Sequence, residues 1–95
     1  MPQAARLTDM NSGHDACAPV PLIEGSDTVL VNGLKLSRLG DKCLPHGCKI
    51  HGVHSDIVSK ASSTVFANGK GVARVGDQTG LATIVIGSSN VQVGG

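Results

Sequence analysis

The stretch TVLVNGLKLSRLGD, at residues 28–41, decides the fold of this protein. A β-branched and apolar run leads directly into Asn32-Gly33, and an alternating segment follows the glycine. Asn-Gly between two such runs predicts a hairpin with a type I′ turn, because that turn requires positive φ at both central residues. The alternation in LKLSRL, residues 34–39, predicts a strand with one buried face.

This pattern repeats along the chain. The stretch STVFANGKGVARVGD, residues 63–77, matches all of it, and GSSNVQVGG, residues 87–95, matches its first half. The segment AARLTD, residues 4–9, matches its second half. No segment has a helical period long enough to predict a helix. We therefore predict one all-β domain over residues 1–95, built from short hairpins in a pseudo-threefold repeat.

The loops between the repeated segments differ in length. The first loop, over residues 9–28, spans 19 positions, the second, over 41–64, spans 23, and the third, over 77–90, spans 13. Every His and Cys of the chain lies in the first two loops, which are about 6 and 10 residues longer than the third. If the three units pack around one axis, the corresponding loops meet at one end of the molecule.

The composition limits what the core and the partners can be. The chain has 13 Gly, one aromatic residue, Phe66, and no Trp or Tyr, so its core must be narrow and needs a staple. Three cysteines without an export signal argue against a disulfide framework, which makes a metal the favoured staple. The net charge of +1 argues against nucleic-acid binding. The apolar runs are too short to span a membrane.

The histidines and cysteines gather in two places. The stretch KCLPHGCKIHGVHSD, residues 42–56, holds three of the four histidines and two of the three cysteines, and SGHDAC, residues 12–17, holds the rest. Zinc binds four N or S ligands in a tetrahedron, and short spacings within one loop allow the loop to wrap a single ion. We predict a zinc site that draws on five candidate ligands: His14, His46, Cys48, His51 and His54.

The assignment of the four ligands within this set stays open. We favour three histidines with Cys48, and we interpret Cys17 and Cys43 as small apolar side chains. Asp15 and Asp56 would either orient ligand rings or lie in solvent. Iron or nickel is an alternative to zinc.

The repeated arginines and aspartates allow two interpretations. Arg6, Arg38 and Arg74 would either form a solvated face or pair with an Asp or carbonyl group of a neighbouring unit. The Gly-Asp pairs at 40–41 and 76–77 are interpreted as turn residues and not as catalytic carboxylates.

These segments together resemble the PAAR-repeat family, whose members cap the spikes of bacterial type VI secretion systems and contractile phage tails. The resemblance covers nearly the whole chain, on AARLTD, TVLVNGLKLSRLGD, STVFANGKGVARVGD and GSSNVQVGG. The tetrapeptide Pro-Ala-Ala-Arg itself is absent, and QAAR (3–6), KLSR (35–38) and GVAR (71–74) stand in its place. Many relatives carry a third-loop Cys or His, where this chain has residues 78–81, QTGL.

The resemblance implies a small cone of β-hairpins with a metal at its apex. It implies that His14 is the first-loop ligand and that His46, Cys48, His51 and His54 belong to the ligand-bearing second loop. The wide base would dock on a trimeric β-helical spike of the VgrG or phage type, one chain per trimer, with bound effector cargo as a further partner. The protein would be made in the bacterial cytoplasm and expelled with the spike, or sit at a phage tail tip, and would pierce the target membrane transiently.

Two other functions are compatible with these residues. A free-standing zinc module would bind another protein, and a small zinc hydrolase would need an open coordination position and a general base. Five candidate ligands favour a closed structural site, so we expect no enzymatic activity. We also expect no fused toxin domain after Gly95.

Overall fold

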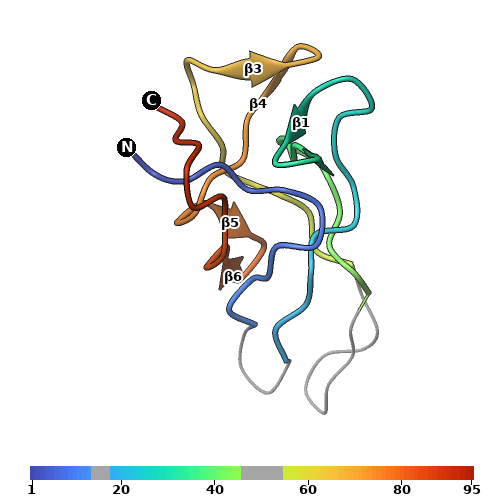
Figure 1. Cartoon of the computed structure of the whole chain (residues 1–95). Coiled ribbons are helices and arrows are strands. Elements are labelled where there is room, and N and C mark those ends of the chain that lie inside the picture. Colours follow the sequence, from blue (N-terminus) through green and yellow to red (C-terminus); the bar gives the residue numbers. More distant parts are fainter. Residues whose placement is uncertain (14–17, 46–54) are drawn as a thin grey trace.

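The computed structural model describes residues 1–13, 18–45 and 55–95. These residues form only short strands, joined in antiparallel hairpins, and no helix occurs among them. The strands are β1 (Leu30–Val31), β2 (Leu34–Lys35), β3 (Phe66–Ala67), β4 (Lys70–Gly71), β5 (Gln78–Thr79) and β6 (Ala82–Thr83), paired β1–β2, β3–β4 and β5–β6 (Figure 1). The predicted all-β fold is confirmed.

Both predicted Asn-Gly hairpins form. Asn32 and Gly33 have φ of 54° and 78°, and Asn68 and Gly69 have φ of 54° and 77°. Strand register follows from these two-residue turns, with Val31 opposite Leu34 and Ala67 opposite Lys70. The near-identity of the two turns shows that the sequence repeat is also a structural repeat.

The third hairpin of the repeat is assembled from the two ends of the described chain. Gln3 pairs antiparallel with Gln92, as Lys35 pairs with Leu30 in the β1–β2 hairpin. The Val93 N–H donates to the Pro2 carbonyl at 2.8 Å, and the Ala4 N–H donates to the Val91 carbonyl at 2.9 Å. Segment 2–4 therefore takes the place of β2, and segment 91–93 takes the place of β1 (Figure 1).

A closed ring of backbone hydrogen bonds joins the three units at their centre. The Ala5 N–H donates to the Ala73 carbonyl, the Ala73 N–H to the Ser37 carbonyl, and the Ser37 N–H to the Ala5 carbonyl, at 2.9–3.0 Å. All three residues are fully buried. Small side chains are required here because three backbones approach one axis closely.

Narrow apolar layers lie on both sides of this ring. One cluster contains Ala4, Val31, Leu36, Ala67, Val72 and Val93, and the other contains Ala5, Val20, Leu22, Cys43, Val58, Ala73 and Ile84. The sole aromatic side chain, Phe66, is 59% exposed and contributes to neither cluster. Apart from Cys43, the core is therefore built from aliphatic side chains.

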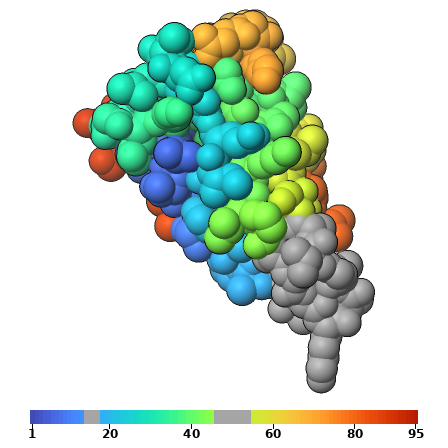
Figure 2. All heavy atoms as spheres, turned by 90° about the vertical axis from the view of Figure 1, so that its right-hand side faces the viewer, coloured from blue at the N-terminus to red at the C-terminus, as the bar shows by residue number. Residues whose placement is uncertain are grey.

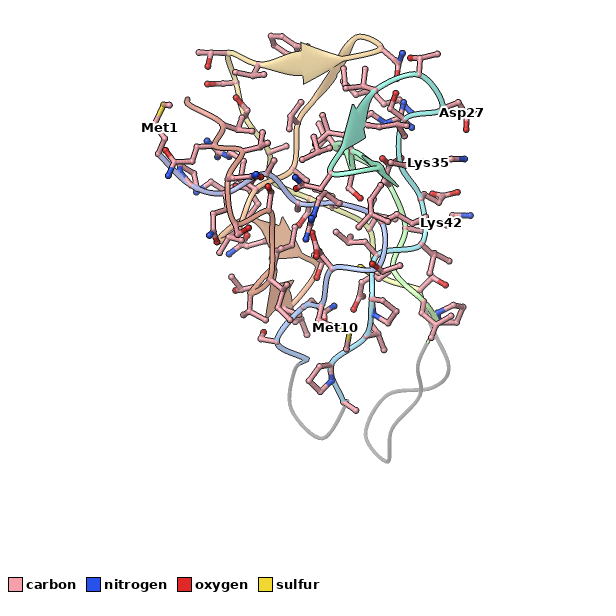
Figure 3. The ribbon with its side chains drawn as sticks, viewed as in Figure 1. Met1, Met10, Asp27, Lys35 and Lys42 are labelled. Carbon is pink, nitrogen blue, oxygen red and sulfur yellow. The ribbon has the colours of Figure 1, made fainter. Side chains whose placement is uncertain are left out.

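The molecule is widest around the β1–β2 and β3–β4 hairpins and narrows away from them (Figure 2). β1–β2, β3–β4 and the paired chain ends lie toward the broad end, and β5–β6 lies nearer the narrow end (Figure 1). Met10 also lies at the narrow end (Figure 3). Among the described residues, no helix is long and apolar enough to cross a membrane.

Candidate functional site

The predicted metal ligands fall outside the described residues. His14, His46, Cys48, His51 and His54 all lie in segments 14–17 and 46–54, as do Asp15 and Cys17. The described residues contain no cluster of three or more His, Cys, Asp or Glu side chains that could hold a metal. The ligand assignment therefore stays a prediction.

The residues that flank both segments come together at the narrow end. The Leu44 N–H donates to the Pro21 carbonyl at 2.9 Å, which joins the approach to the second segment with the exit from the first. The Cys43 N–H donates to the Asp56 carbonyl at 2.8 Å, which ties the two sides of the second loop together. Figure 1 shows all four flanking chain ends at this end of the molecule. The chain therefore enters and leaves both ligand-bearing segments at the narrow end (Figure 1).

Asn11 holds the base of the first loop. Its Oδ1 accepts hydrogen bonds from the N–H groups of Gly13 and Val20, both at 3.0 Å. Its Nδ2 donates to Thr79 Oγ1 at 3.2 Å and lies 3.9 Å from Cys43 Sγ. Each of Asn11, Cys43 and Thr79 stands two residues after its repeat Asp, and each is fully buried. Three equivalent positions thus form a polar layer on the axis, directly beneath the loops.

Cys43 is a structural member of this layer. Burial raises the pKa of its thiol, and the nearby Asp56 carboxylate raises that pKa further, although hydrogen bonds from Thr79 and Asn11 act in the opposite direction. A neutral buried thiol is a poor nucleophile and a poor metal ligand. The interpretation of Cys43 as a small buried residue agrees with this placement.

The repeated arginines form a second, wider ring. Arg38 donates from its backbone N–H and from Nε to Asp41 Oδ2, at 2.7 and 3.0 Å, and from Nη2 to Asp41 Oδ1 at 3.1 Å. Its Nη1 donates to Asn68 Oδ1 at 3.0 Å, in the following hairpin. Arg6 repeats these contacts with Asp9 and Asn32.

The third unit keeps this arrangement with one replacement. Arg74 contacts Asp77 in the same way, and its Nη1 reaches the Gly94 backbone carbonyl at 3.4 Å, where the other units use an Asn side chain. In all three units the hydrogen bond that the arginine donates to the aspartate raises the pKa of the arginine. The arginines therefore pair with the Asp of their own unit, so the predictions of a solvated face and of an Asp from a neighbouring unit are both wrong. They reach the next unit through an Asn side chain or, at Arg74, through a carbonyl group as predicted. The aspartates are buried structural acceptors.

The broad end carries exposed apolar side chains. Leu30 is 58% exposed and Phe66 is 59% exposed, and they occupy equivalent positions on β1 and β3. The third equivalent residue is Gln92, which is also exposed. Val29, Val65 and Met1 add further exposed apolar surface toward this end. The family resemblance implied a docking base, but the sequence pattern could not show which side chains lie outward there.

Leu30, Phe66 and Gln92 also lie on strand edges that pair with no other segment among the described residues. The Leu36 N–H donates to the Val29 carbonyl, and the corresponding bonds join Val72 to Val65 and Ala4 to Val91. Antiparallel pairing alternates, so the next pairs, which contain Leu30, Phe66 and Gln92, turn their N–H and C=O groups away from the hairpin. Within the described part of the chain, no other segment pairs with these three edges. The broad end thus offers three pseudo-equivalent sites for strand addition.

One flank holds a polar cavity of about 400 Å³ that the sequence did not reveal. Asp27, Lys35 and Lys42 project from this flank (Figure 3). Lys35 Nζ lies 2.8 Å from Asp27 Oδ1, and its hydrogen bond lowers the pKa of Asp27. Arg38 in the cavity wall is bound to Asp41. Because these charges compensate one another, the cavity has little charge to offer a ligand.

No family model matches this chain, and no curated protein matches it.

Proposed function

We propose that this protein is a structural tip for a trimeric β-helical spike of a contractile injection machine, of the PAAR-repeat type. In this role the broad end closes the blunt end of the spike, and the narrow end leads through the target membrane. The observation that carries the proposal is the threefold repetition of free strand edges at Leu30, Phe66 and Gln92. A trimeric β-helix ends in three equivalent strand edges, so both partners would satisfy their backbone groups by pairing.

The interior of the fold suits a mechanical role. Three arginines, each paired with the aspartate of its own unit, also reach the next unit, and a closed ring of backbone bonds links every unit to the other two. Bidentate, largely buried pairs hold geometry more firmly than exposed pairs do. Such cross-linking would resist shear along the axis during penetration.

We further propose a structural zinc at the narrow end, held by four ligands from His14, His46, Cys48, His51 and His54, with iron or nickel as alternatives. The convergence of the flanking residues supports this site, because the hydrogen bond from Leu44 to Pro21 joins the approach to the second segment with the exit from the first. Neutral imidazoles with one thiolate are typical zinc ligands. A bound ion would offset the entropy of closing two long loops over a narrow core.

The test uses the purified full chain. Elemental mass spectrometry should find about one zinc per chain, and a chelator should lower the melting temperature strongly. The chain should then co-elute with a purified VgrG-type spike trimer at one chain per trimer, measured by light scattering. If the chain contains no metal and a chelator leaves its melting temperature unchanged, the zinc site is wrong. If the chain binds no trimer in a panel from secretion systems and phages, the spike-tip role is overturned.

A further inference from the structure

We infer that the spike partner recognises this protein through backbone edges and one permissive apolar socket per subunit, and not through side chains matched to particular positions. This inference rests on the proposed function. It follows from an asymmetry at the broad end, where the three pseudo-equivalent positions carry three different side chains: Leu30, Phe66 and Gln92.

The backbones at these positions are equivalent although the side chains differ. Each residue lies opposite its partner in a non-hydrogen-bonded pair, with Lys35, Gly71 and Gln3 respectively. The carbonyls of those three partners accept hydrogen bonds from a neighbouring unit, from the N–H groups of Leu7, Leu39 and Val75, at 2.8–2.9 Å. The inner edge of each hairpin is therefore occupied, and no segment of residues 1–13, 18–45 or 55–95 pairs with the outer edge.

A homotrimer presents three identical surfaces to these three positions. One subunit would meet an aliphatic chain, the next an aromatic ring and the third an amide. A socket shaped tightly around any one of them would reject the others, because overpacking and unpaired polar groups both cost free energy. The common feature left for recognition is the outward N–H and C=O of each edge.

The same geometry predicts that binding depends on which side chains the three positions carry together, and not on which position carries which side chain. A threefold-symmetric partner binds any of three rotations of this chain equally, so exchanging Leu30 and Phe66 rebuilds the same set of contacts on different subunits. An asymmetric partner would present different surfaces to the two residues and would detect the exchange.

The experiment measures the dissociation constant for the VgrG-type trimer that binds the wild-type chain. The double variant Leu30→Phe/Phe66→Leu should bind within about twofold of wild type, since its total apolar burial is unchanged. Gln92→Leu should bind about fivefold tighter, because a third aliphatic side chain enters the socket. Gln92→Pro should bind about tenfold more weakly, because it removes an outward N–H that no backbone hydrogen bond among the described residues uses.

Melting temperatures of the variants show whether each one is folded. If Gln92→Pro fails to fold, Leu30→Pro and Phe66→Pro provide the same test at equivalent edges. A loss of tenfold or more in the exchange variant overturns the inference while leaving the spike-tip role intact. Unchanged binding of all three proline variants also overturns it, as does a dimer of this chain formed through the broad end. If the wild-type chain binds no trimer, the proposed function fails first.

Discussion

The side-chain amide of Asn11 donates to the hydroxyl of Thr79 at 3.2 Å, although 68 residues separate them in sequence. Cys43, which occupies the same position in the middle unit, completes this layer. The contact joins the first and third units at the level where the ligand-bearing loops begin. At the narrow end, polar side chains therefore add to the backbone bonds that hold the repeats together.

Replacing Asn11 tests this layer. Asn11→Ala would leave the buried N–H groups of Gly13 and Val20 without their acceptor. We expect a loss of about 2–4 kcal/mol in the free energy of unfolding, because each unsatisfied buried donor costs about 1–3 kcal/mol. Denaturant unfolding of chelator-treated protein separates this effect from metal binding. Asn90→Ala is the control, since Asn90 is exposed and should cost less than about 1 kcal/mol. If both variants lose the same free energy of unfolding, Asn11 is not a critical hydrogen-bond acceptor for this layer.

A second prediction concerns the backbone at Thr8. Thr8 has φ of 79°, whereas the equivalent residues of the other units are Gly40 and Gly76, with φ of 88° and 94°. A β-branched residue is strained in this region, by roughly 1–3 kcal/mol, and part of that is offset by the lower backbone entropy of its unfolded chain. We expect Thr8→Gly to stabilise the protein by about 0.5–1 kcal/mol.

The reciprocal change provides the matched control. Gly40→Thr should destabilise by about 1–2 kcal/mol, and nothing lies within 4 Å of the added Cβ position, so the loss would report backbone strain alone. Thermal unfolding of both variants is sufficient. A lower melting temperature for Thr8→Gly would show that the threonine side chain contributes a compensating contact.

The hairpins could be predicted from the sequence because their determinants are local. Asn32-Gly33 and Asn68-Gly69 specify turn type and register within four residues, and the structure follows both. The third hairpin could not be predicted in this way. Its strands are segments 2–4 and 91–93, and only long-range pairing reveals that they belong together. The β5–β6 hairpin was not predicted either. Gly80, with φ of 65°, provides its turn, whereas the sequence pattern indicated only a loop over residues 77–90.

The candidate site also contains residues that the sequence reveals and residues that it does not. The five candidate ligands are recognisable by residue type and spacing, which are properties of the sequence alone. The residues beneath them are not recognisable, since Asn11, Cys43 and Thr79 share a position in the repeat but no chemistry. The repeat alignment places all three two residues after the Asp, and this register was the available signal.

The buried ion pairs provide a third prediction. Asp41 is only 3% exposed. Arg38→Ala would leave its carboxylate without the guanidinium partner. Breaking such a pair from one side costs about 3–5 kcal/mol, because the remaining charge stays buried. Asp27→Asn is the control, because Asp27 and Lys35 form an exposed pair, and it should leave the unfolding curve unchanged. Similar losses for the two variants would contradict the structural role of the arginine ring.

The last prediction is a pH dependence at Cys43. Burial raises the pKa of its thiol in the folded protein, so the folded state keeps this proton at a pH where the unfolded chain releases it. The contribution of Cys43 to stability is therefore complete below about pH 8.5, the pKa of an unperturbed thiol, and is lost as the pH rises toward the folded pKa. Cys17 and Cys48 are present in both wild type and Cys43→Ser, so the difference between the two proteins isolates Cys43. Denaturant unfolding of chelator-treated protein from pH 7 to pH 10 should show a steeper decline for wild type than for Cys43→Ser. Parallel curves would mean that the thiol is accessible to solvent in the folded protein.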